Sequence, residues 1–362
     1  MLVRLTPVCS ASFRSTSLSP GLNTSLNNAS RSVTTVCSRN VGESAIDQSV
    51  HSCIAASSPV VPSMTATRST LSSQVADSNT VDHMPVCRYT KKSSSNEGPG
   101  MAPMRTKDDL IAYERSGKGH PLVLVHGVGA NLQSWEDVSP QLEGSFDIIR
   151  SDLRGHGQSA HIDSEYSVEK FAADIVRVMD DAGVRKAHLV GFSLGGLIAQ
   201  ELACSYSDRF ERVVLLSAVA GRTPAEREKV VARLQMIRDG GMDAVVGAAH
   251  DRWFTKEFAE RHPDVIERRI AELKAVHVPS YLEAYRVFGL TELVDRLPEI
   301  RQPTLVMTGE FDQGSNVRMA ETMHRLIPDS ELRILAGLKH SVLVEASKLV
   351  SDHVREFLLR PR

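Results

Sequence analysis

Short apolar runs alternate with longer amphipathic segments from about residue 109 to residue 220, and again after residue 300. The runs at 121–125, 187–190 and 213–216 are almost continuously apolar, which is typical of parallel strands buried on both faces. Between them, residues 167–182 show helical spacing that ends at Gly183, with an apolar face formed by Phe171, Ile175, Val178 and Met179. This alternation predicts an α/β fold with a doubly wound, mostly parallel sheet.

The same patterns predict the other elements of this sheet and its helices. We expect strands at 110–114, 146–152, 303–307 and 332–335, and helices opening at Ser134 and Trp135 and covering 194–206, 316–326 and 347–359. In open parallel sheets, ligands bind at the carboxyl ends of the strands. Chemically interesting residues at those ends are therefore the first candidates for a site.

Between residues 221 and 300 the strand signals vanish. Charged segments with helical character, such as 225–237 and 265–275, take their place. We interpret 221–300 as a helical cap, or lid, inserted over the carboxyl ends of the strands. The α/β core is then expected in two parts, 105–220 and 301–362.

Residues 1–104 are rich in Ser, Thr and Asn and show no period of 2 or 3.6, which predicts a disordered leader. No acidic residue precedes Glu43, while arginines are spread among serines, so 1–42 resembles an organelle transit peptide. The alternatives are an unstructured leader of unknown purpose, or upstream sequence with the true start at Met101 or Met104. The expected location is cytoplasmic, or organellar if 1–42 is a transit peptide.

Composition narrows the function classes. The 362 residues carry a formal net charge of −2, which argues against a nucleic-acid-binding surface. No run of about 18 apolar residues is present, so we expect no membrane span. Of five cysteines only Cys204 lies in the folded part, and no Cys/His cluster has zinc-ligand spacing. The sequence thus predicts neither a disulfide framework nor a metal or other cofactor, and it leaves the oligomeric state open.

The strongest chemical signal is a Gly-x-Ser-x-Gly motif formed by Gly191, Ser193 and Gly195, between a predicted strand and a predicted helix. A turn tight enough to project the serine hydroxyl leaves room only for small residues two positions before and after it. We therefore predict that Ser193 is a nucleophile.

A serine nucleophile needs a base and a group that orients this base. In this architecture the three occur in the order serine, acid, histidine. Asp312 follows one strand end and His340 follows the last, so we assign His340 as general acid/base and Asp312 as its orienting carboxylate. Glu310, two positions from Asp312, is the reserve candidate for the acid.

Hydrolysis through a serine develops an oxyanion that needs two preorganised donors. The backbone N–H of Leu194 is one candidate, and that of Val128 is the other, with Gly129 as the alternative. We expect His126 to brace this loop by hydrogen bonding. The turn formed by Asp152, Arg154, Gly155, Gly157 and Ser159 is expected to be structural.

Taken together, His126-Gly127-Val128-Gly129, the turn at 152–159, Gly191-Phe192-Ser193-Leu194-Gly195-Gly196, Asp312 and His340 resemble the α/β-hydrolase superfamily over residues 108–360. Within it the chain is most similar to 3-oxoadipate enol-lactonases and carboxylesterases. This resemblance implies a cofactor-free serine hydrolase that acts on a small ester or lactone. In the cap, Arg252 and Trp253 are candidate substrate contacts, as a clamp for a carboxylate and an apolar wall. The alternative, which we favour from the sequence, is that Arg252 is an exposed helix residue and Trp253 packs the cap onto the core. Lys339 stands where many relatives have glycine before the histidine, which leaves the pH optimum open.

The nucleophile type separates this chain from several relatives. Haloalkane dehalogenases and epoxide hydrolases of this fold have Asp at the elbow, and dienelactone hydrolases have Cys. Meta-cleavage C–C hydrolases also use Ser and stay an alternative, as does a ligand receptor of the same fold with slow turnover.

Overall fold

The computed structural model describes residues 103–361. The predicted leader, including the transit peptide proposed for 1–42, lies outside the described residues except for its last two positions. Met104, the last residue of the predicted leader, belongs to a strand.

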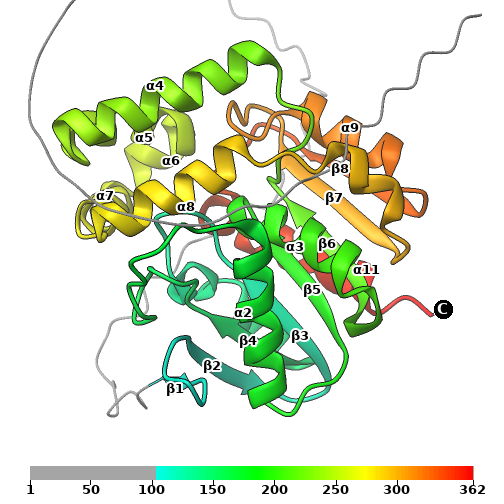
Figure 1. Cartoon of the computed structure of the whole chain (residues 1–362). Coiled ribbons are helices and arrows are strands. Elements are labelled where there is room, and N and C mark those ends of the chain that lie inside the picture. Colours follow the sequence, from blue (N-terminus) through cyan, green and yellow to red (C-terminus); the bar gives the residue numbers. More distant parts are fainter. Residues whose placement is uncertain (1–102, 362) are drawn as a thin grey trace, which may run out of the picture. The chain divides into compact units, whose positions relative to one another are not determined.

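One sheet forms the centre of the described part of the chain (Figure 1). Its eight strands lie in the order β1-β2-β4-β3-β5-β6-β7-β8. They are β1 (Met104–Arg105), β2 (Ala112–Gly117), β3 (His120–Val125), β4 (Phe146–Ser151), β5 (Ala187–Phe192), β6 (Phe210–Leu216), β7 (Thr304–Gly309) and β8 (Ser330–Leu335). Strands β1 and β2 are antiparallel to their neighbours and the others are parallel. The predicted fold class is confirmed.

Helices cover both faces of this sheet. They include α1 (Ser139–Leu142), α2 (Val168–Asp181), α3 (Leu194–Ser205), α9 (Val317–Leu326), α10 (Val342–Glu345) and α11 (Ser347–Leu358), with 3₁₀ turns η1 (Leu132–Trp135), η2 (Ser207–Arg209) and η3 (Val294–Glu299). Buried residues of α2, α3 and α9 pack on one face, and those of α1, α10 and α11 pack on the other. Helix α2 starts where the Ser167 hydroxyl accepts the N–H of Lys170, and its predicted apolar face is buried.

Five helices lie together between β6 and β7, on the side of the carboxyl ends of the parallel strands (Figure 1). They are α4 (Pro224–Gly240), α5 (Asp243–Trp253), α6 (Lys256–Arg261), α7 (Pro263–Lys274) and α8 (Val278–Leu290). Thr223 and Glu226 form a reciprocal capping box at the start of α4. Residues of α4, α5, α7 and α8 share a small apolar core of their own. This helical group is the cap of the site described below.

Two predicted elements differ from the structure. Ser134 and Trp135 do not open a helix; they end the 3₁₀ turn η1, where Asn131 accepts the N–H of Gln133 and the Trp135 side chain is fully buried. The strand expected at 110–114 starts two residues later, because Thr106 to Ile111 form a turn in which Asp109 has a φ of 59°.

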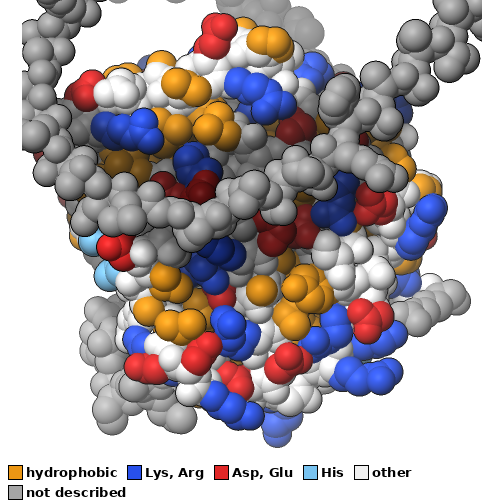
Figure 2. All heavy atoms as spheres, viewed as in Figure 1, with side chains coloured by type: hydrophobic (Ala, Val, Ile, Leu, Met, Phe, Trp, Pro, Cys, Tyr) orange, Lys and Arg blue, Asp and Glu red, His pale blue; other side chains and the backbone are white. Residues whose placement is uncertain are grey.

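The surface agrees with the nearly neutral composition. On the face in Figure 2, acidic and basic side chains are interspersed over the core and the cap. Among the helices of the described residues, none combines the length and apolar character that crossing a bilayer demands.

Candidate active site

Ser193 sits at the sharp turn between β5 and α3. Its backbone has φ 56° and ψ −114°, a combination that a non-glycine residue rarely adopts. A side chain at Gly191 would collide with the carbonyl oxygen of Gly195, and one at Gly195 with the carbonyl oxygen of Val125. The glycines are therefore required by the close passage of three backbone segments.

The structure brings Ser193, His340 and Asp312 together although they come from three different strand ends. The His340 Nε2 lies 3.2 Å from the Ser193 Oγ, and its Nδ1 lies 2.6 Å from the Asp312 Oδ2. The Asp312 side chain is fully buried, and its Oδ1 accepts the backbone N–H groups of Gly314 and Ser315 at 2.9 Å each. Asp312 thus orients His340, and His340 in turn contacts the Ser193 hydroxyl.

The reserve candidate for the acid lies elsewhere. Glu310 is exposed, and its carboxylate accepts the backbone N–H of Gly337 at 2.8 Å. Lys339, which precedes the histidine, donates from Nζ to the backbone carbonyl of Asp251 at 2.6 Å. The lysine therefore links the histidine loop to the cap rather than facing the imidazole.

The loop after β3 is fixed by two buried histidines. The Nε2 of His126 accepts the N–H of Leu153 at 2.9 Å, so its proton is on Nδ1, which donates to the Gly127 carbonyl at 2.7 Å. His156 accepts the N–H of Gly129 at 3.1 Å through Nε2 and donates from Nδ1 to the carbonyl of Arg154 at 3.0 Å.

Burial keeps both rings neutral. It lowers the pKa of His126 to about 4. For His156, burial and then the neighbouring His126 lower the pKa to about 3. The Gly129 N–H is engaged by His156, and Gly127, Val128 and Gly129 all line the cavity beside Ser193.

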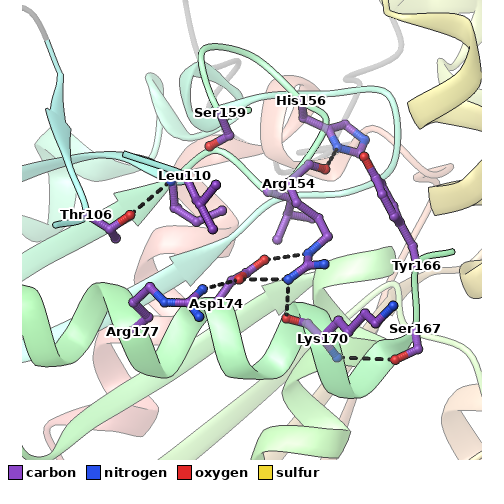
Figure 3. A network of polar contacts seen from close by, with 12 residues as sticks. Thr106, Leu110, Arg154, His156, Ser159, Tyr166, Ser167, Lys170, Asp174 and Arg177 are labelled. Carbon is purple, nitrogen blue, oxygen red and sulfur yellow. Dashed lines mark hydrogen bonds and ion pairs between the residues drawn. The ribbon is translucent and has the colours of Figure 1, made fainter. Parts of the chain in front are cut away.

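The turn at 152–159 is held by side-chain contacts away from the cavity. Asp152 accepts the N–H groups of Leu132 and Gln158 at 2.7 Å each. Figure 3 shows the Arg154 guanidinium between the Asp174 carboxylate, at 2.6 and 2.9 Å, and the Lys170 carbonyl. These residues connect the active-site loop to helix α2.

A cavity of about 170 Å³ lies between Ser193, His340 and Asp312 on one side and the cap on the other. Ser193, His340 and Val128 line its floor. Arg252 and Trp253, the two candidate substrate contacts in the cap, line it from α5. Burial, and then the nearby Arg233, lower the pKa of Arg252.

Several residues of the cavity roof were not predicted from the sequence. They are Arg233, Arg269, Glu272, Tyr281, Tyr285 and Phe288. The sequence held one sign that Arg233 is buried, because it lies on the same face of α4 as Val230, Leu234 and Ile237, all of which are buried. Arg233 itself is only 8% exposed.

Apart from this site, one group of potential metal ligands occurs within the described residues. His120, His188 and Glu211 each offer a ligand atom, and these atoms lie within 4.8 Å of one another. The three residues come from three strands, so their spacing in the sequence gave no sign of it.

Comparisons with known proteins agree with this architecture. Residues 120–347 match the family described as alpha/beta hydrolase fold. The chain is 28% identical to the (E)-2-((N-methylformamido)methylene)succinate hydrolase of Acinetobacter baylyi, over 68% of this chain and 93% of the relative. It is 27% identical to 3-oxoadipate enol-lactonase 2 of the same organism, over 71% and 96%. The solved enol-lactonase of Burkholderia xenovorans LB400 superimposes with a TM-score of 0.66 at 27% identity, covering 69% of this chain and 96% of that one.

Proposed function

The chain belongs to the α/β hydrolase fold family, and within it we propose a serine hydrolase that cleaves a small carboxylic ester or lactone through an acyl-enzyme on Ser193. The observation that carries this proposal is the continuous chain of contacts from Ser193 Oγ through His340 to the buried Asp312. No metal or organic cofactor enters the proposed mechanism.

Each residue has a defined step. His340 Nε2 takes the proton of Ser193 while Oγ forms a bond to the substrate carbonyl carbon. The oxyanion receives hydrogen bonds from the N–H groups of Val128 and Leu194. When the tetrahedral intermediate collapses, the C–O bond to the leaving group breaks and His340 gives this oxygen its proton. A water molecule, deprotonated by His340, then adds to the acyl carbon. The bond from this carbon to Ser193 Oγ breaks, His340 returns the proton to Oγ, and the carboxylic acid leaves.

The charge of the cavity supports a substrate that carries a carboxylate. Outside the triad, its lining holds Arg233, Arg252 and Arg269 but only one acidic residue, Glu272, which is paired with Arg269 at 2.8 Å. Among the described residues Arg233 forms no ion pair; its guanidinium stacks over Tyr285 at 5.6 Å. The two curated relatives named above carry succinate and oxoadipate in their names. An acidic ester or lactone, held by Arg233 and Arg252 against Trp253, therefore fits this cavity.

The serine mechanism is tested with Ser193→Ala and a short-chain aryl ester. We expect a loss in kcat of about 10⁴-fold or more with unchanged thermal unfolding, because the substitution removes the nucleophile alone. Retained activity in a folded Ser193→Ala variant would contradict the proposal. A panel of lactones, short esters and vinylogous diketones separates the reaction types: turnover of the diketones alone identifies a C–C hydrolase, and a single turnover without recycling identifies a receptor.

The substrate charge is tested with two aryl esters of similar size, one neutral and one ending in a carboxylate. We expect Arg233→Gln and Arg252→Gln to raise KM for the acidic ester by about 10-fold to 100-fold and to leave the neutral ester nearly unchanged. Arg238→Gln, on the exposed side of the same helix as Arg233, is the matched control. Equal losses for both esters would show that the arginines only pack the cap.

A further inference from the structure

A group of two histidines and one glutamate lies at the opposite end of the strands from Ser193. His120 is the first residue of β3, His188 is the second of β5 and Glu211 is the second of β6. These three strands are neighbours in the sheet (Figure 1). The side chains therefore meet at the amino ends of the strands, whereas the proposed catalytic residues lie at their carboxyl ends.

A local irregularity of β6 directs the glutamate to this group. Ala187 pairs with Phe210 and Leu189 pairs with Val213, so β6 has one residue more than β5 in this interval. Phe210 and Val213 both pack in the same apolar cluster, and the extra residue is accommodated between them. In a regular strand Glu211 would share the face of Val213; with the bulge it contacts His120 instead, with Nε2 to Oε2 at 2.9 Å.

The geometry of the three side chains suits a transition-metal ion. Their ligand atoms lie within 4.8 Å of one another, and the rings of His120 and His188 are 4.4 Å apart. Ligand atoms around a tetrahedral zinc ion are about 3.3 Å apart, given bonds of about 2.0–2.2 Å. The His120 side chain is 41% exposed, so it has room to adjust, while His188 is buried and the ring of Phe146 lies beside it.

We propose that His120, His188 and Glu211 form a binding site for a divalent transition-metal ion such as Zn²⁺, with water as the remaining ligand. A donor set of two imidazoles and one carboxylate favours Zn²⁺, Co²⁺ and related ions, whereas Ca²⁺ and Mg²⁺ favour oxygen ligands alone. Ser193 follows His188 by five positions along β5 and the turn after it, a distance of about 16 Å in an extended chain. The ion would therefore connect three strands and stabilise the core without taking part in hydrolysis.

The experiment uses the full chain after removal of metal by a chelator, titrated with Co²⁺ and followed by visible absorption. We expect one ion bound with the weak bands of nitrogen and oxygen ligands, and a rise in the thermal midpoint on addition of Zn²⁺. Binding through the thiolates of Cys9, Cys37, Cys53 or Cys87 would add an intense near-ultraviolet band, which distinguishes it from binding at the proposed site.

Two variants test the residues separately. His120→Ala and Glu211→Gln are each expected to weaken Co²⁺ binding at least tenfold and to abolish the Zn²⁺-dependent rise, with ester hydrolysis unchanged. His324→Ala, an exposed histidine on α9, is the matched control and should bind as the wild type does. Two results would show that the proposal is wrong and that the three residues form only a hydrogen-bonded group. One is that both site variants bind Co²⁺ like the wild type. The other is that the wild type shows no saturable binding of Co²⁺ up to on the order of 10⁻⁴ M, a weak affinity for a site with three protein ligands.

Discussion

The backbone N–H of Gly129 donates to the Nε2 of His156 at 3.1 Å. This contact favours Val128 over Gly129 as the second oxyanion donor, a choice that the sequence left open after β3. A backbone N–H that is already bonded to a buried imidazole is a poor donor for a developing oxyanion, because the existing bond would have to break. The contact supports Val128, together with Leu194, as the proposed oxyanion hole.

Replacing Val128 with proline removes this N–H while leaving Gly127 and Gly129 in place. We expect kcat for an aryl ester to fall by about 10²-fold to 10³-fold, the usual cost of one oxyanion donor. The measurement is steady-state kinetics with a parallel thermal unfolding curve. Val128→Ala, which keeps the N–H, is the control and should retain most of the activity. Comparable kinetics for the two variants would exclude Val128 as a donor.

The two acidic candidates near the last strands are separable by mutation. Asp312→Asn is expected to lower kcat by about 10⁴-fold, because an amide neither stabilises the imidazolium nor selects the required tautomer of His340. Glu310→Gln should leave kcat within about twofold, since among the described residues its carboxylate accepts a hydrogen bond only from the exposed Gly337 N–H. Activity against pH for both variants is the measurement. A large effect of Glu310→Gln would reverse the assignment.

The elbow glycines allow a matched comparison of packing. At Gly195 an added methyl group would collide with the Val125 carbonyl oxygen, whereas at Gly144 it would meet no atom within 4 Å. We expect Gly195→Ala to destabilise the fold by about 1–3 kcal/mol, or about 5–10 °C in Tm, and to displace Ser193 enough to abolish most hydrolysis. Gly144→Ala should change neither property. Normal activity in Gly195→Ala would show that the elbow has more room than the structure indicates.

The features predicted well from the sequence are those encoded by neighbouring residues. The apolar runs specify β3, β5 and β6, and the glycines around Ser193 specify a turn whose geometry depends only on local backbone contacts. Chain order and strand ends were enough to propose Asp312 and His340. The fold class follows from the alternation of these elements.

The features that could not be predicted depend on how separate elements meet. Arg233 enters the cavity because α4 packs over the strand ends, which the periodicity of α4 alone does not reveal. Glu211 meets His120 through the bulge in β6, and a bulge leaves no regular pattern in the sequence. The choice between Val128 and Gly129 required the position of His156, which follows a different strand.

The buried histidines make a prediction about acid stability. Folding lowers the pKa of His126 to about 4 and that of His156 to about 3, from 6.5 in a solvated histidine, with burial as the main cause. Below pH 6.5 the unfolded chain therefore binds protons that the folded chain does not, so stability is fully present above pH 6.5 and decreases as the pH falls towards 4. Each histidine contributes about 1.4 kcal/mol per pH unit in this window.

Urea unfolding of His156→Gln at pH 6.5, 6.0, 5.5 and 5.0 should show a lower free energy of unfolding at pH 6.5 but a shallower decline than the wild type. His324→Gln, at an exposed position, should keep the steeper decline. Equal slopes in all three proteins would mean that His156 is protonated without cost in the folded state, which its contact with the Gly129 N–H does not permit.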